Sequence, residues 1–140
     1  ALDGDYFGSF PSGNDVAGGD FVALFTLSTP VVIGPTLDQI QAVVFTPTCA
    51  SANCHSGPAS NVLPGGLDLS DADASFASLV NVPSIQQPTI MRVAPNDPDN
   101  SYLIQKLEGN AGTRMPLGGQ PLDPAVIAEI RQWISDGALR

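Results

Sequence analysis

Cys49-Ala50-Ser51-Ala52-Asn53-Cys54-His55 is the stretch around which this chain is organised. It contains both cysteines and the single histidine of the 140-residue sequence. A histidine placed at random would directly follow the second cysteine in roughly one chain in a hundred, so the grouping indicates shared chemistry. Two thiols followed at once by an imidazole are typical of covalent haem attachment, in which each sulfur adds to a vinyl group and the imidazole binds the iron. The usual spacer between the thiols is two residues, whereas here it is four.

Three other interpretations of this cluster compete with haem attachment. A disulfide between Cys49 and Cys54 is compatible with a secreted chain and would leave His55 without a role. A zinc site needs a further Cys or His ligand, and the sequence contains none. A thioredoxin-like redox pair needs two intervening residues and a βαβ context, and neither is present. The cluster alone therefore favours a haem and leaves the disulfide open.

The composition is that of one acidic domain with many turns. The sequence has 14 glycines and 13 prolines, and only 14% of its residues are charged, so long regular elements are not expected. The formal net charge of −9 makes nucleic acids and anionic membrane surfaces poor partners, and it favours redox partner proteins with a basic docking face. No apolar run is long enough to predict a membrane span.

The cellular location follows from the same cluster. Covalent haem of this type is attached outside the cytoplasm, so we expect an exported protein, periplasmic or extracellular. The sequence opens at Ala1 without a positively charged leader, and we therefore expect that an export signal has been removed.

Residues 1–35 differ in composition from residues 36–140. They are rich in glycine and contain no Lys or Arg. The apolar runs 20–27 and 30–33 carry aromatic and β-branched residues and predict short strands bounded by turn residues. This strand-like arm has two interpretations. It packs on its own domain, or it offers an exposed strand to a neighbouring subunit and so supports a homo-oligomer or a filament.

The spacing of apolar residues over 36–140 predicts about four short helices, and hence a mainly α domain. The last helix has the clearest apolar stripe, which includes Ile130, Trp133 and Ile134. The predicted helices are Thr36–Phe45, capped by Thr36 with Gln39 and ended by Thr46-Pro47; about Asp71–Val80, started by Ser70 with Asp73; Ser101–Leu107, ended by Gly109; and a last helix from Asp123-Pro124 to Gly137.

A second candidate iron ligand lies in the segment Gly112-Thr113-Arg114-Met115-Pro116. Methionine usually fills apolar gaps, so its position in a loop rich in glycine and proline is unusual. A loop methionine whose sulfur is directed at iron completes a low-spin haem. The alternative is that Met115 packs over the core. Met91 is the only other methionine.

Further site residues follow from the chemistry of a bound haem. A coordinated imidazole usually donates its other N–H to a carbonyl or carboxylate, and the carbonyl of Pro58 is the candidate acceptor. Arg92, Lys106 and Arg114 are three of the five basic residues, and we expect one or more to pair with a haem propionate. Arg114, which adjoins Met115, is the first choice.

These pieces together resemble the small monohaem cytochrome c domains of the planctomycete type. The resemblance covers roughly residues 36–140, and residues 1–35 have no counterpart in the family pattern. It implies a cytochrome c-like fold around one covalent haem c, with thioethers at Cys49 and Cys54 and axial ligands His55 and Met115. The matching segments are the cluster 49–55, Gly66–Ser70, Ala94–Leu107, Arg114–Gly119 and Leu122–Ala138.

Electron transfer is the function that this resemblance implies. Protein ligands at both axial positions keep substrates from the iron, so we expect an electron carrier and not an enzyme, with no residue acting as acid, base or nucleophile. Methionine ligation raises the reduction potential relative to two histidines. Two alternatives stay open: a haem enzyme or gas sensor with a displaceable sixth ligand, and a subunit of an extracellular conductive filament joined through residues 1–35.

Overall fold

The computed structural model describes residues 34–51, 54–57 and 66–140. By their internal contacts, residues Val32–Arg140 form one compact unit that is separate from Ala1–Val31. The predicted strands 20–27 and 30–33 lie outside the described residues, so the two interpretations of the N-terminal arm stay predictions.

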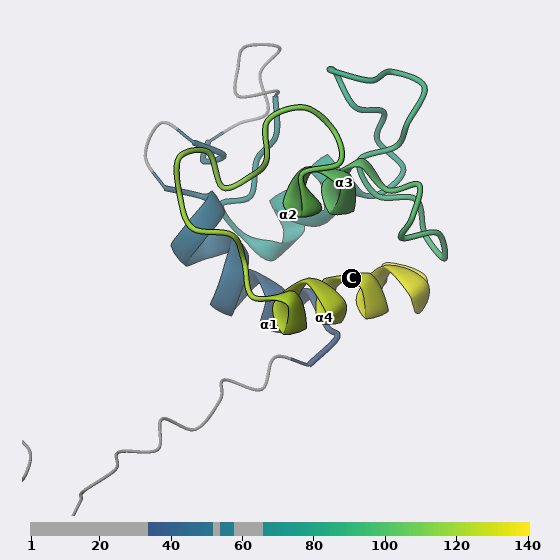
Figure 1. The fold of residues 1–140 in the computed structure, drawn as a ribbon. Helices are drawn as coiled ribbons and strands as arrows, with labels where there is room; N and C mark the ends of the chain where they lie inside the picture. Colours follow the sequence, from purple (N-terminus) through teal and green to yellow (C-terminus); the bar gives the residue numbers. More distant parts are fainter. Residues whose placement is uncertain (1–33, 52–53, 58–65) are drawn as a thin grey trace, which may run out of the picture. The chain divides into compact units, whose positions relative to one another are not determined.

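The described part of the chain is mainly helical, which confirms the predicted class (Figure 1). Within the described ranges, β structure is limited to two isolated bridges, between Val80 and Val93 and between Pro83 and Met91. None of the helices in these ranges has the length and apolar character needed to cross a bilayer. The helices are α1 (Leu37–Ile40), η1 (Gln41–Cys49), α2 (Ala72–Leu79), α3 (Tyr102–Glu108) and α4 (Pro124–Ser135).

The first helical segment begins where the sequence predicts and ends later. The Thr36 hydroxyl accepts a hydrogen bond from the N–H of Gln39 at 3.4 Å, which confirms the N-cap. The predicted end at Phe45 is wrong, because the chain continues as the π-helix η1 to Cys49, with Pro47 inside it. In an α-helix the proline ring clashes with the carbonyl four residues earlier, and the wider turn of i→i+5 bonding moves that carbonyl away. The first cysteine is therefore the last residue of a helix.

The other helices are close to their predicted positions because their ends carry local signals. Asp71 caps α2 by accepting a backbone N–H of the first turn at 2.8 Å, so the predicted cap at Ser70 is one residue early. Gly109 ends α3 in the left-handed region, with φ of 82°, where glycine is favoured. Asp123 caps α4 and Pro124 occupies its first turn, which confirms both predictions.

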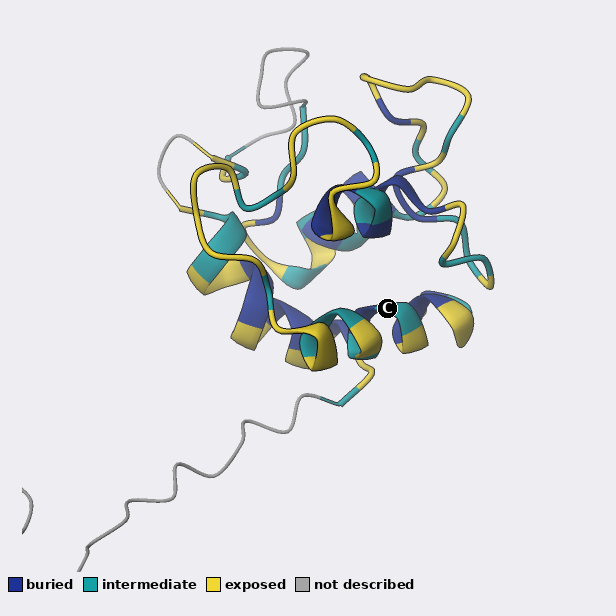
Figure 2. Ribbon diagram, viewed as in Figure 1, coloured by how far each residue is buried: buried dark blue, intermediate teal, exposed yellow. Residues whose placement is uncertain are grey.

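One apolar core joins these helices. In Figure 2 the exposed residues of α4 lie along its outer side, and its buried residues face the other helices. Trp133 is held in this core by its indole N–H, which donates to the carbonyl of Leu139 at 2.8 Å. Cys49 and Met115 pack against the core from outside and are partly buried. The core consists of Leu37, Ile40, Val44, Phe45, Leu69, Leu79, Val93, Ile104, Leu107, Ile130, Trp133, Ile134 and Ala138.

Candidate functional site

A cavity of about 760 Å³ lies beside the core, between the end of η1, helix α3 and the loops around them. Small-molecule and cofactor sites usually measure about 300–1,000 Å³ and have mainly apolar walls. Ile85 and Leu117, which line the cavity, are 51% and 72% exposed, so its rim reaches the protein surface. The lining residues are Cys49, His55, Leu67, Leu69, Leu79, Ser84, Ile85, Gln86, Gln87, Arg92, Tyr102, Leu103, Lys106, Leu107, Ala111, Gly112, Thr113, Met115 and Leu117.

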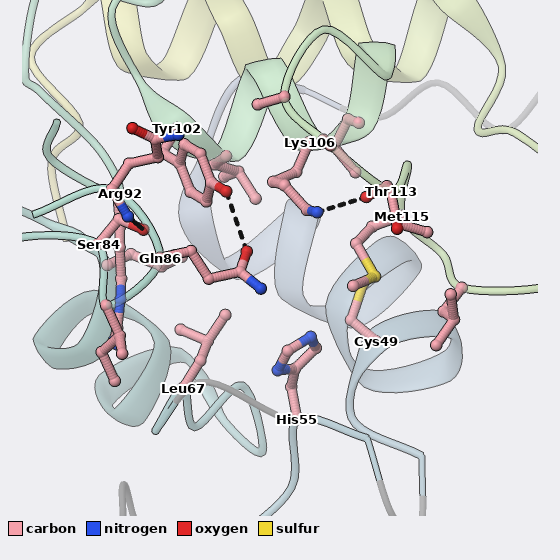
Figure 3. A pocket seen from close by; sticks show the side chains of 18 of the residues that line it. Cys49, His55, Leu67, Ser84, Gln86, Arg92, Tyr102, Lys106, Thr113 and Met115 are labelled. Carbon is pink, nitrogen blue, oxygen red and sulfur yellow. Dashed lines mark hydrogen bonds between the residues drawn. The ribbon is translucent and has the colours of Figure 1, made fainter. Parts of the chain in front are cut away.

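Two backbone hydrogen bonds fix the main chain of His55 at the cavity wall. Its N–H donates to the carbonyl of Cys49 at 3.0 Å, and its carbonyl accepts from the N–H of Leu69 at 2.8 Å. The first bond holds the histidine against the last residue of η1, and the second holds it against the buried Leu69. Figure 3 shows the half-buried imidazole pointing into the cavity, where an occupant could bind its ring nitrogen.

The two cysteines occupy different environments. Both are free thiols, so the structure gives no support to the disulfide interpretation. Cys49 is partly buried and lines the cavity, whereas Cys54 is exposed and is not among the lining residues. Burial and, to a smaller extent, the nearby Cys54 raise the pKa of the Cys49 thiol to about 11. The Cys49 thiol is therefore neutral at physiological pH.

Met115 reaches the same cavity from the loop that follows α3. Its N–H donates to the carbonyl of Lys106 at 2.9 Å, and its side chain lines the cavity while packing against the core. Met91, the other methionine, is 39% exposed and is not among the lining residues. The cavity thus brings one imidazole and one thioether together from segments that are far apart in the sequence.

Buried basic groups also line the cavity. Arg92 and Lys106 are buried lining residues. Arg114, the first choice from the sequence for a propionate partner, is exposed, lies beside Gly109 and is not a lining residue. Among the described residues that line the cavity, none is an Asp or a Glu. The first choice for a propionate partner therefore moves from Arg114 to the two buried cations.

Each buried cation is held by main-chain carbonyls. The Arg92 guanidinium donates from Nη1 to the carbonyl of Ser78 at 2.8 Å and to that of Gly66 at 3.3 Å, and burial lowers the pKa of Arg92. The Nζ of Lys106 donates to the carbonyl of Thr113 (Figure 3). These bonds keep two positive charges at the cavity wall, where acidic groups of an occupant would complement them.

The donor set of the cavity fits a haem better than a bare metal ion. Among residues 34–51, 54–57 and 66–140, no group of three or more His, Cys, Asp or Glu side chains could hold a metal ion, and a bound zinc ion needs three or four such ligands. A haem carries its own equatorial nitrogens, so one imidazole and one thioether complete the coordination of its iron. Its apolar ring suits the apolar walls, and its propionates suit the two cations.

Some wall residues gave no signal in the sequence. Ser84, Ile85, Gln86 and Gln87 come from a loop without apolar periodicity, and only the fold brings them to the cavity. Pro58, the predicted acceptor for the His55 ring, lies outside the described residues. No family model, curated protein or solved structure matched the chain.

Proposed function

We propose that this chain is an electron carrier with one covalent haem c. Cys49 and Cys54 would form the thioethers, and His55 and Met115 would be the axial ligands. The observation that carries the proposal is that Cys49, His55 and Met115 line one cavity, although Met115 is 60 residues after His55 in the sequence. When bound, the haem supplies a one-electron couple between ferric and ferrous iron.

The helical arrangement supports a cytochrome c-like fold as part of this proposal. A helix leads directly into the first cysteine, and the C-terminal helix packs Trp133 into the same core that supports Cys49 and Met115. This is the order of elements that the resemblance to monohaem cytochrome c domains implies.

The residues of the chain would tune the cofactor in three ways. His55 and Met115 would occupy both axial positions and exclude other ligands. The buried wall residues Leu69 and Leu79 would keep water from the iron, which favours the less charged, reduced state. Arg92 and Lys106 would hold the propionates through charge-assisted hydrogen bonds.

Electron exchange would take place at the rim of the cavity. The exposed side chains of Ile85 and Leu117 lie there, so one edge of a bound ring would come close to the surface. A partner could approach this edge without entering the cavity. We expect an exported protein, because covalent haem of this type is attached outside the cytoplasm. Its redox partners should carry a basic docking face, because the chain has a formal net charge of −9.

A haem enzyme or gas sensor is the main competing function, and it requires a sixth ligand that leaves easily. The main-chain bond from Met115 to Lys106 and the packing of Met115 against the core favour a ligand that stays bound. An optical spectrum separates the two functions. A low-spin ferric spectrum with a methionine–iron charge-transfer band supports the carrier, whereas a high-spin spectrum and ready binding of carbon monoxide support the enzyme or sensor.

Covalent attachment has its own test. The full chain is expressed with a haem-attachment system in an exporting host. Its mass is measured by mass spectrometry after denaturation, and its pyridine haemochrome spectrum is recorded. We expect a mass increase of one haem that survives denaturation in the wild type and is absent from the Cys49→Ser/Cys54→Ser double variant. A wild-type protein without added mass would refute the proposed function.

A further inference from the structure

A buried glutamine lies behind the part of the cavity wall that holds His55. Gln41, the first residue of η1, is 6% exposed. Its Nε2 donates to the carbonyl of Leu69 at 2.8 Å and to the hydroxyl of Thr46 at 3.0 Å. Its Oε1 accepts from the hydroxyl of the buried Ser75 at 2.6 Å. Because a carbonyl can only accept, the bond to Leu69 fixes which end of the amide faces it.

Hydrogen bonds continue from this amide to the histidine. Gln41 holds the carbonyl of Leu69, and the N–H of the same Leu69 donates to the carbonyl of His55 at 2.8 Å. The N–H of His55 in turn donates to the carbonyl of Cys49 at 3.0 Å. The main chain of His55 is therefore linked to both ends of η1, through Leu69 to its first residue and directly to its last.

The π-helical geometry contributes to this network. Gln41 and Thr46 are five residues apart, which is the spacing of one i→i+5 turn, and the side-chain bond between them follows that turn. The network is thus tied to the geometry of the same helix that ends at Cys49. A change in the turn would move Gln41 and Cys49 relative to each other, and so would move both attachment points of His55.

The energetics of burial argue that this glutamine has a specific role. A buried amide costs free energy unless it is hydrogen-bonded, and a leucine of similar size would fill the space without that cost. Both N–H groups of the amide are used, as is its oxygen. A satisfied buried network restricts its members to one geometry, and here the geometry so restricted is that of the segment that holds His55.

We propose that Gln41 is a positioning residue for the axial histidine, acting through Leu69. The proposal rests on the proposed function and deepens it, since it names the residue outside the cavity that fixes the histidine's main chain. Ser75 orients the amide of Gln41 from α2, and Leu69 transmits its position to His55. Without Gln41 the segment at Leu69 loses its anchor, and the imidazole takes more than one orientation over the haem.

The test compares variants of the full-length holoprotein in the ferric state. Paramagnetic proton NMR of the haem methyl groups reports the orientation of the axial ligands, and hydrogen exchange of the Leu69 amide reports the bond to His55. For Gln41→Leu we expect an altered or multiple set of methyl shifts and roughly tenfold faster exchange at Leu69, the change that loss of about 1.4 kcal/mol of local stability produces.

Two matched controls separate positioning from a general loss of stability. Ile130→Val removes a methylene from the buried face of α4, a helix that supplies none of the hydrogen-bonding groups of the Gln41 network, and lowers the stability of the core. Gln132→Leu removes an exposed glutamine amide that donates to Asp136 at 2.8 Å. Both controls should retain the wild-type methyl shifts. If Gln41→Leu does not yield holoprotein, Ser75→Ala, which removes only the bond to Oε1, should still alter the shifts.

Each outcome decides the proposal. Altered methyl shifts in Gln41→Leu, with both controls unchanged, support positioning by Gln41, and where that variant yields no holoprotein the same result in Ser75→Ala supports it. Methyl shifts equal to those of the wild type in the variant that decides, or altered equally in Ile130→Val, overturn it and leave the proposed function intact. A wild-type chain that carries no covalent haem overturns the proposed function and this inference together.

Discussion

The main-chain carbonyl of Lys106 accepts a hydrogen bond from the N–H of Met115 at 2.9 Å. The side chain of the same lysine donates to the carbonyl of Thr113, in the loop that leads to Met115. One residue of α3 therefore holds the methionine loop at two points, and its amino group lies at the cavity wall. The position of the proposed sulfur ligand depends on the helix as well as on the loop.

Replacing Lys106 by methionine should lower the reduction potential of the holoprotein. A buried positive charge near the iron disfavours the ferric state, so removing that charge stabilises the ferric state. At a separation on the order of 10 Å and an effective dielectric constant of about 20, the effect is about 1–2 kcal/mol, or roughly 40–80 mV for one electron. A spectroelectrochemical titration measures the change.

Arg114→Met is the matched control for this prediction. It removes the same charge from an exposed side chain that is not among the cavity-lining residues, where water and salt screen the interaction. We expect a much smaller fall in potential. Equal falls in reduction potential in the two variants would mean that the buried position of Lys106 does not strengthen its effect on the iron.

Met115→Ala should convert the ferric protein to a high-spin form that binds carbon monoxide after reduction. The substitution removes the only methionine sulfur among the described cavity-lining residues, so the methionine–iron charge-transfer band should disappear. Met91→Ala, a change at the 39% exposed methionine, should leave the band in place. Persistence of the band in Met115→Ala would assign the sixth ligand to another residue.

The Cys49 thiol should make the free energy of unfolding depend on pH, and only in the haem-free chain. Burial, and then Cys54, raise the pKa of this thiol from 9.0 to about 11, so the folded state favours the neutral form. The contribution of this thiol to the free energy of unfolding is fully present below about pH 9 and is lost as the pH rises through about 11. The loss amounts to about 2–3 kcal/mol. Urea unfolding at pH 8 and at pH 11 measures it.

Cys49→Ser is the control for this pH dependence, because serine does not titrate in the range. The covalently loaded protein should also lack the loss, since a thioether has no proton to release. A loss of the same size in Cys49→Ser would mean that another group causes the alkaline destabilisation.

The sequence predicts the helices whose ends carry local signals and fails where the geometry is not local. Asp123 marks the beginning of α4 and Gly109 the end of α3, through caps that adjacent residues decide. The π-helix has no comparable signal, and Pro47 is normally a sign that a helix has ended. Its continuation to Cys49 depends on a wider turn that residue types alone do not predict.

The sequence predicts two residues that the structure brings to one cavity, and it predicts less of the cavity's other walls. Met115 and His55 are predicted from the sequence by their ligand atoms, and the fold brings both to one cavity. Arg114 is the first choice from the sequence because it adjoins Met115, yet adjacency along a loop does not decide which side chains reach the cavity, and Arg114 is exposed and outside its lining. Lys106 is distant from the methionine in sequence, and the pairing of α3 with its following loop brings them together.

Residues 1–33 carry the apolar runs 20–27 and 30–33, on which the filament interpretation rests. Because Val32–Arg140 form a compact unit by their own contacts, a chain that begins at Gly34 and retains the Thr36 cap should bind haem with an unchanged optical spectrum. If the arm joins subunits, the full-length holoprotein should form oligomers at high concentration, whereas the shortened chain stays monomeric. Sedimentation velocity over a concentration series measures both.

Leu24→Asp, a single charge in the apolar run 20–27, should weaken association without truncation. A full-length protein that stays monomeric at the highest concentration would refute the filament role while leaving electron transfer by the haem domain untouched.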